Sequence, residues 1–110
     1  AEWCAASVCT SYLEAGSEMI KKVASTNANT LYERIRKFFP KNVTCFVDEK
    51  YPPKTGDLIF FAQNGKMYHV GMVNAYQPDT HQVITIEGNH NNRVEIVTRS
   101  SWYAFARIDS

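Results

Sequence analysis

The sequence predicts a single α+β domain in which N-terminal helices pack on one side of a curved antiparallel sheet or small barrel. Two observations predict it. Apolar residues recur at helical spacing over the first forty residues, and the pattern then changes to short runs rich in Val, Ile, Phe and Tyr. Connections such as QNGK and QPDTH carry turn residues, so neighbouring strands are expected to pair antiparallel as a meander. Helices that precede the strands argue against a doubly wound parallel sheet.

Three helices are expected before the strands. The first covers residues 4–15, which lack Gly and Pro until a glycine ends the helix. Ser17 can cap a second helix over about 18–24. The sequence TLYE at 30–33 has the pattern of a capping box and opens a third helix. Pro40 ends that helix because proline cannot continue the hydrogen-bond ladder.

Every apolar run after Pro40 is short enough to be a strand. A connection rich in Pro and Gly, YPPKTGD, separates the first run from the others. The expected strands cover residues 42–47, 57–62, 67–76, 82–88, 93–98 and 102–108. No internal repeat, linker or low-complexity tract divides the chain, so residues 1–110 are expected to form one domain.

The composition is that of a soluble globular protein. Hydrophobic residues make up 45% of the chain, and twelve basic and eleven acidic residues are interspersed, which disfavours a nucleic-acid partner. No run approaches the roughly 20 apolar residues of a membrane span, so no membrane insertion is expected. We expect a monomer. Because the chain begins three residues before Cys4, we also expect a piece of a longer protein, with any export signal upstream.

The three cysteines are Cys4, Cys9 and Cys45. Their odd number and the absence of a CxxC pair argue against a disulfide framework and a structural zinc site. On a helix, Cys9 lies about 500° round from Cys4, too far for a bridge. Cys9 and Cys45 are therefore expected in the core, and a disulfide between these two is left open.

Cys4 stands where a nucleophile would be activated. The first turn of a helix carries unpaired N–H groups and a partial positive charge, which stabilise a thiolate and lower the thiol pKa from about 8.5. The same N–H groups can receive the oxyanion of a tetrahedral intermediate. Ala5 and Ala6 are small, so they let the helix end approach a sheet and keep the thiol open to substrate. The alternative is a buried structural cysteine.

His69 is the best-placed base among the three histidines. It lies within the strand sequence YHVGMV and shares a face with Gly71, which leaves room beside the imidazole. His81 and His90 follow turn-like sequences and are expected in solvent.

Glu87 and Asn89 can supply the group that orients the imidazole. They end the apolar strand VITI two residues apart, so both can project to one face beside the strand of His69. Either side chain can hold the second ring nitrogen. The alternative is that each is a polar residue where a strand enters a turn.

Together, EWCAASVCTSYLEAG, KTGDLIFF, YHVGMV, ITIEGN and WYAFARI resemble the CHAP family, the cysteine, histidine-dependent amidohydrolases and peptidases of bacterial and phage cell-wall lysis. The resemblance covers nearly the whole chain. NlpC-type peptidases share the Gly-Asp and His-Val-Gly segments, but they begin with Asp-Cys-Ser-Gly and use a second histidine where this chain has Glu87. Asp57, in the Gly-Asp segment, is expected to organise the start of its strand rather than to take part in chemistry.

The resemblance implies a papain-like fold and a role for each site residue. Cys4 becomes the nucleophile, His69 the general base and Glu87 the carboxylate that orients the base. Asn89 becomes a further polar member of the site. Trp3 is expected to pack beside the site and line the substrate groove.

The resemblance also implies the reaction. A thioester on Cys4 would form during hydrolysis of a peptidoglycan amide, within the stem or cross-bridge or between stem and sugar, without a metal or organic cofactor. Such an enzyme works outside the cell or in the wall, secreted or phage-encoded. Three alternatives stay open: a non-catalytic cell-wall binding domain on the same scaffold, a cysteine amidase used as an antibacterial toxin, and a Cys and His metal site, which the scattered cysteines disfavour.

Overall fold

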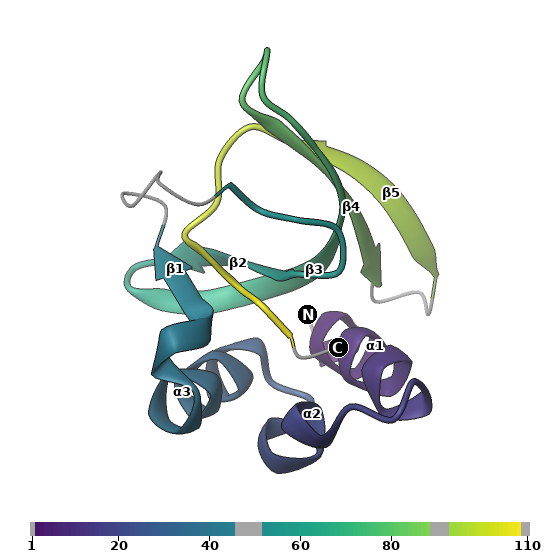
Figure 1. Cartoon of the computed structure of the whole chain (residues 1–110), viewed down its shortest axis with the longest axis vertical. Helices are drawn as coiled ribbons and strands as arrows, with labels where there is room; N and C mark the ends of the chain where they lie inside the picture. The colour runs from purple at the N-terminus through teal and green to yellow at the C-terminus, as the bar shows by residue number, and fades with distance from the viewer. Residues whose placement is uncertain (1, 46–51, 89–92, 109–110) are drawn as a thin grey trace.

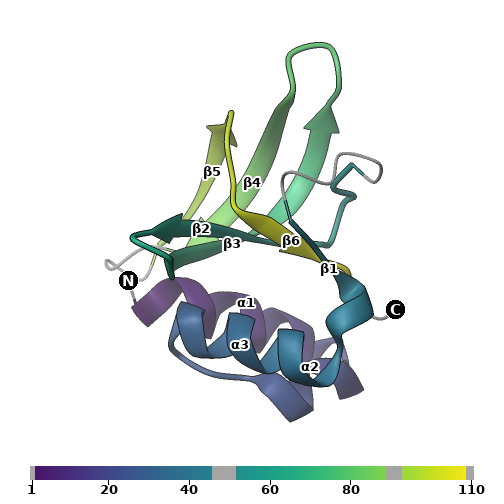
Figure 2. The ribbon, with the colours of Figure 1, turned by 90° about the vertical axis from the view of Figure 1, so that its left-hand side faces the viewer.

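The computed structural model describes residues 2–45, 52–88 and 93–108, with the backbone alone described for Glu2 and Trp3. Helices form one layer and a six-stranded antiparallel sheet forms the other (Figures 1 and 2). The predicted α+β class is confirmed, with the helices on one side of a strongly curved sheet (Figure 2). None of the described helices is long and apolar enough to span a membrane.

The helical layer agrees with the sequence except at one cap. Its elements are α1 (Glu2–Glu14), α2 (Glu18–Val23), α3 (Ala28–Phe38) and the 3₁₀ turn η1 (Pro40–Asn42). Ser17 caps α2 as predicted, because its hydroxyl accepts a hydrogen bond from the Ile20 N–H at 3.1 Å. The predicted capping box at 30–33 is wrong. Asn27 caps α3 instead, since its side-chain oxygen already accepts from the Thr30 N–H at 2.9 Å.

The sheet is a meander only in part. Its strands are β1 (Val43–Cys45), β2 (Leu58–Gln63), β3 (Lys66–Gln77), β4 (Gln82–Gly88), β5 (Val94–Arg99) and β6 (Ala104–Ala106). The spatial order is β1-β6-β2-β3-β4-β5, and every neighbouring pair is antiparallel. β6 therefore returns to lie between β1 and β2, which a simple meander does not do.

Each face of the sheet carries its own apolar cluster. One cluster, which includes Phe60 and Val70, packs the helices against the sheet. The other lies on the opposite, concave face and consists of Ile59, Phe61, Val73, Val83, Trp102 and Phe105. Alternation along β2 explains the division, because successive side chains point to opposite faces.

A β-bulge interrupts the pairing of β2 with β3 beside His69. Phe61 lies opposite His69, whereas the next residue, Ala62, lies opposite Met67, so Tyr68 is the extra residue. Bulges redirect side chains and occur often beside active sites. The helix that carries Cys4 contacts β3 and β4, so α1 begins close to this irregular stretch.

Candidate active site

Cys4 lies in the first turn of α1 and contacts the imidazole of His69. The thiol and the ring form a side-chain hydrogen bond, and the backbone N–H groups of Ala5 and Val70 also reach the sulfur. The prediction that the thiol is open is wrong, because Cys4 is 0% exposed. Ala5 is buried as well and belongs to the same apolar cluster, so this turn of α1 packs against the core. The adjacent imidazole of His69 stays 14% exposed.

Cys4 and His69 shift each other's proton affinity in opposite directions. Burial alone would raise the pKa of Cys4, but the hydrogen bonds from His69 and the backbone outweigh it and lower that pKa below 9.0. Burial alone would lower the pKa of His69, but the bonds to Cys4 and Glu87 raise it from 6.5 to about 9. Both shifts favour the shared proton on the imidazole, so they favour the ion pair of thiolate and imidazolium over the neutral pair.

Glu87, near the end of β4, holds the other side of the imidazole. The Nε2 atom of His69 lies 2.5 Å from Oε1 of Glu87, which leaves Nδ1 for the thiol. Thr85 donates its hydroxyl hydrogen to Oε2 of the same carboxylate. Burial opposes ionisation of Glu87, yet its hydrogen bonds, that from His69 first, lower its pKa from 4.5 to about 2. The carboxylate therefore stays charged and fixes which ring nitrogen faces Cys4.

Gly71 makes the contact between β3 and β4 possible. The pairing of Met72 with Ile86 sets Gly71 opposite Glu87. A Cβ at position 71 would lie 2.8 Å from Cγ of Glu87, too close for any side chain. The sequence predicted that Gly71 leaves room beside the imidazole. The Glu87 side chain occupies this room where it reaches His69.

Arg99 is the site residue that sequence reasoning missed. It ends β5, donates from Nε to Oε2 of Glu87 at 2.9 Å and from Nη2 to Oε1 at 2.6 Å, and lies 4.6 Å over the ring of Phe61. A buried carboxylate needs a cation, so a basic residue on a neighbouring strand was the signal that could have identified this partner of Glu87. Both Arg93 and Arg99 fit that signal, and the strand register that distinguishes them cannot be obtained from the sequence.

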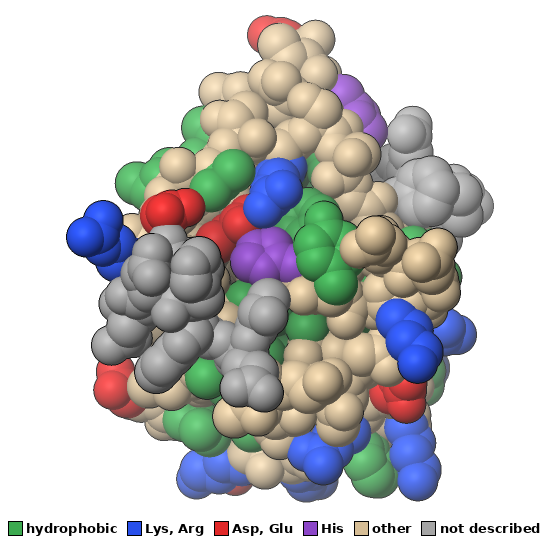
Figure 3. Space-filling model, turned by 180° about the vertical axis from the view of Figure 1, so that it is seen from behind, with side chains coloured by type: hydrophobic (Ala, Val, Ile, Leu, Met, Phe, Trp, Pro, Cys, Tyr) green, Lys and Arg blue, Asp and Glu red, His purple; other side chains and the backbone are tan. Residues whose placement is uncertain are grey.

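Figure 3 shows one face of the molecule with side chains coloured by type. Purple, red and blue side chains lie side by side near its centre, with hydrophobic side chains next to them. The arrangement joins a sulfur nucleophile, an imidazole and a fixed carboxylate in one hydrogen-bonded series, which is the set of groups that covalent acyl transfer requires.

Two predicted site residues have no described side chain. Asn89 lies outside the described residues, and so does the side chain of Trp3, although its backbone belongs to α1. Their roles stay predictions. Of the other two histidines, His81 has a φ of 52° and stacks on Trp102 with ring centroids 5.1 Å apart, whereas His90 lies outside the described residues.

The remaining cysteines stand apart from this site. All three cysteines are free thiols, so Cys9 and Cys45 are not bridged. Cys9 is in the core as predicted, and burial raises its pKa. Cys45 is only half-buried. Among the residues that the structure describes, no cluster of three or more His, Cys, Asp or Glu side chains could hold a metal ion.

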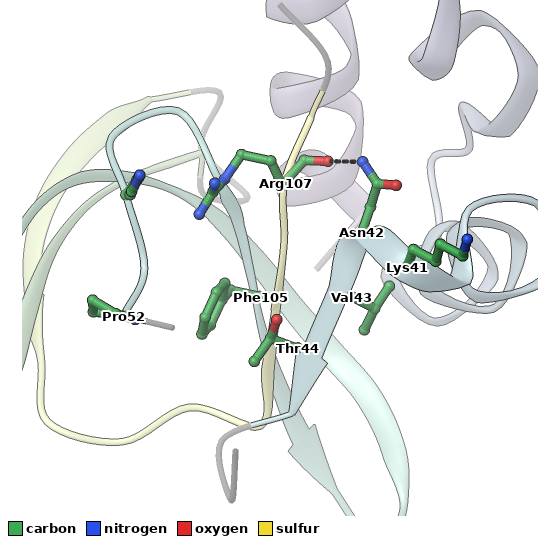
Figure 4. Close-up of a pocket in the computed structure, with 8 residues that line it drawn as sticks. Lys41, Asn42, Val43, Thr44, Pro52, Phe105 and Arg107 are labelled. Carbon is green, nitrogen blue, oxygen red and sulfur yellow. Dashed lines mark hydrogen bonds between the residues drawn. The ribbon is translucent and has the colours of Figure 1, made fainter. Parts of the chain in front are cut away.

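Asp57 organises the start of β2, as expected. It accepts from the Lys54 N–H at 2.9 Å and from Nε of Arg107 at 2.5 Å. Arg107 and Lys54 also line a cavity of about 450 Å³ between η1, β1, β6 and the loop before β2 (Figure 4). None of the residues that line it belongs to the Cys4, His69 and Glu87 series.

Comparison with known proteins gives one match. The family model described as the CHAP domain matches residues 1–89, a range that contains Cys4, His69 and Glu87 but not Arg99. No curated protein and no solved structure matches the chain significantly.

Proposed function

The chain belongs to the CHAP family, whose members are generally hydrolases acting on peptidoglycan, and from this premise we propose that it cleaves a peptidoglycan amide bond through a thioester on Cys4. The observation that carries the proposal is the continuous series of hydrogen bonds from Cys4 through His69 to Glu87. The bond is either within the stem or cross-bridge, as for an endopeptidase, or between stem and sugar, as for an amidase.

In the first half of the reaction, the Cys4 thiolate attacks the carbonyl carbon. N–H groups at the start of α1 stabilise the oxyanion that forms. The imidazolium of His69 then gives its Nδ1 proton to the nitrogen of the scissile bond, the carbon–nitrogen bond breaks and the amine leaves. Glu87 stabilises the imidazolium and holds its orientation throughout.

In the second half, water releases the acyl group. Neutral His69 takes a proton from water, the hydroxyl oxygen attacks the thioester carbonyl and the carbon–sulfur bond breaks. The product is a carboxylic acid, which loses its remaining proton to solvent, and the original thiolate beside the imidazolium is restored. Every group in both halves belongs to the chain, to substrate or to solvent water, so the proposal involves no cofactor.

We further propose that the fold is papain-like and that the enzyme acts as a monomer on the wall, whether secreted, phage-encoded or delivered as an antibacterial toxin. The packing of the nucleophile helix α1 against β3, the strand of His69, supports the fold assignment. Asn89 is proposed as a further polar member of the site and Trp3 as part of the substrate groove. The chemistry is the same in each biological setting.

A non-catalytic cell-wall binding domain is the second candidate. The observation that favours it is the burial of Cys4, because a binding domain has no need of an exposed sulfur. In that case Cys4 would be dispensable. The two candidates therefore differ in what a change at Cys4 does to wall lysis.

Mass spectrometry of purified peptidoglycan after incubation with the protein tests the proposal. We expect new amine and carboxylate ends, a free amine on the first stem alanine for an amidase or within the stem or bridge for an endopeptidase. Cys4→Ala should abolish them, whereas the control Cys45→Ala should not. An intact wall with the folded wild-type protein, or full cleavage by Cys4→Ala, would establish the binding domain instead.

A further inference from the structure

A cavity with mostly aromatic walls lies beside His69. Its volume is about 200 Å³. It is lined by Phe61, Ala62, Tyr68, Ser101, Trp102 and Tyr103. We call it the aromatic pocket. Its described lining contains no charged side chain, and the site proposed above does not use it.

Two residues of this lining flank the imidazole itself. The ring of Phe61 stacks on that of His69 with centroids 5.7 Å apart, and the ring of Tyr68 does so at 6.2 Å. Phe61 is the cross-strand partner of His69, and Tyr68 is the extra residue of the bulge. The aromatic pocket is therefore adjacent to the imidazole of His69.

The position of the pocket relative to Cys4 fixes the direction of the substrate. Cys4 belongs to the apolar cluster on the helix side of the sheet, whereas Phe61 and Trp102 belong to the cluster on the concave side. His69 contacts both the thiol and Phe61, so it lies between them. With its carbonyl carbon at the sulfur and its nitrogen at the imidazole, a substrate continues from the nitrogen toward the concave side.

We infer that the aromatic pocket binds the residue that carries the leaving amine, and that this residue is uncharged and has a small side chain such as alanine. The inference rests on the proposed function and sharpens its substrate class. A cut that frees the amine of a diamino acid or of glutamate is disfavoured, whereas a cut that frees an alanine amine is favoured.

The charges around the pocket support this choice of occupant. Arg99 lies 4.6 Å over the Phe61 ring, and its guanidinium already holds the carboxylate of Glu87 through two hydrogen bonds. A charged substrate side chain in the pocket would lose its hydration without gaining a free counter-charge. A methyl group gains from burial against the aromatic walls and has no charge to desolvate.

Trapping the acyl-enzyme with added amines tests the inference. The amine nitrogen attacks the thioester carbonyl, His69 takes the amine proton and Cys4 leaves as thiolate, so the new amide reports what the leaving-amine subsite accepts. Peptidoglycan is digested at about pH 8, where α-amines are partly deprotonated. The digest contains equal concentrations of glycinamide, alaninamide, lysinamide and the α-amide of glutamate. Mass spectrometry measures each adduct against the hydrolysed end.

The variant Tyr68→Ala removes an exposed wall of the pocket, and Phe38→Ala removes an equally exposed aromatic ring on α3 as the matched control. In the wild type and in Phe38→Ala, we expect the alaninamide adduct to exceed each of the other three by at least about threefold. In Tyr68→Ala, the ratio of alaninamide to glycinamide adducts should fall toward one.

Three outcomes would overturn the pocket assignment while the proposed function stands: charged amines that react as well as alaninamide, an unchanged ratio in Tyr68→Ala, or hydrolysis with no adduct at all. If the wild-type protein releases no new ends from the wall, the proposed function fails and the inference fails with it.

Discussion

Two buried carboxylates in this molecule are held in nearly the same way, yet only one of the two belongs to the candidate active site. Asp57, just before β2, accepts hydrogen bonds from Nε and Nη2 of Arg107, and Glu87 in β4 accepts hydrogen bonds from Nε and Nη2 of Arg99. The two carboxylates differ in the other group to which each is hydrogen-bonded. Asp57 accepts a backbone N–H of its own turn, whereas Glu87 bonds to an imidazole whose other side faces a thiol.

An arginine–carboxylate pair on its own therefore has only a structural role. Each pair satisfies a carboxylate that folding removes from water, which would otherwise be costly. The hydrogen bonds at Asp57 lead only to the backbone of a loop, whereas those at Glu87 continue through His69 to Cys4. Changes in the series from Cys4 to Glu87 should therefore reduce turnover, and changes around Asp57 should reduce stability.

The largest expected effect follows removal of the reacting groups. Cys4→Ala and His69→Ala should each leave less than about 1% of wild-type wall cleavage, because nucleophile and base act as a unit. The double variant should be no worse than either single variant. Cleavage is measured by release of new amine ends, with circular dichroism to confirm the fold. Losses that multiply in the double variant would show that the two side chains act independently.

Next in size is the contrast between the two carboxylates. Glu87→Gln keeps a hydrogen-bond acceptor for His69 but loses the charge, so turnover should fall by roughly 10- to 100-fold. Both Glu87→Gln and Asp57→Asn should lower the free energy of unfolding by about 1–3 kcal/mol, since buried donors lose an ionic acceptor. Turnover per folded molecule of Asp57→Asn should stay near wild type. Urea unfolding and cleavage assays on both variants decide whether the contrast holds.

The arginines should repeat this contrast more weakly. Arg99→Met leaves Glu87 bound to His69 and Thr85 but without its two guanidinium bonds, so turnover should fall by about tenfold through poorer positioning of the imidazole. Arg107→Met should reduce the melting temperature without reducing turnover. Partial recovery in Arg99→Lys, which restores the charge but not the paired geometry, would separate positioning from charge. Equal turnover in Arg99→Met and the wild type would remove Arg99 from the site.

A further effect concerns stability at low pH. The pKa of Glu87 falls from 4.5 to about 2 on folding, so its contribution is fully present above pH 4.5 and is lost as the pH falls toward 2. Glu87→Gln should therefore lose less free energy of unfolding across that window than the wild type. Urea titrations at several pH values measure this difference. If the free energy of unfolding depended on pH equally in the two proteins, the pKa of Glu87 would not be lowered by folding.

Local signals in the sequence predicted most of the elements and singled out the three side chains that the structure brings together. The helical spacing before Pro40 and the strand runs after it depend on near neighbours, which a sequence contains directly. Cys4, His69 and Glu87 were each identified at the end of, or within, such an element. The return of β6 between β1 and β2 was not predicted, because it depends on pairing between segments far apart in the chain.

What the sequence did not predict depends on register and packing. Arg99 reaches Glu87 only through the pairing of β4 with β5, and the burial of Cys4 depends on the tertiary packing around it. The cap of α3 failed for a different reason. Asn27 and Thr30 are both residue types that can cap a helix, and Asn27 is the cap because its side chain accepts from the Thr30 N–H, so the helix begins at Ala28.

Alkylation of the cysteines by iodoacetamide at pH 6 is the most direct test of the central claim. That claim is that Glu87, held by its hydrogen bonds, maintains a reactive thiolate at Cys4 through His69. Cys4 and Cys9 are both buried on α1, but the pKa of Cys4 is lowered and that of Cys9 is raised. We predict selective labelling of Cys4 in the wild type and in Asp57→Asn, and much slower labelling of Cys4 in Glu87→Gln, where His69 more readily loses its proton. Labelling of Cys9 as fast as Cys4, or labelling of Cys4 that Glu87→Gln leaves unchanged, would contradict the account.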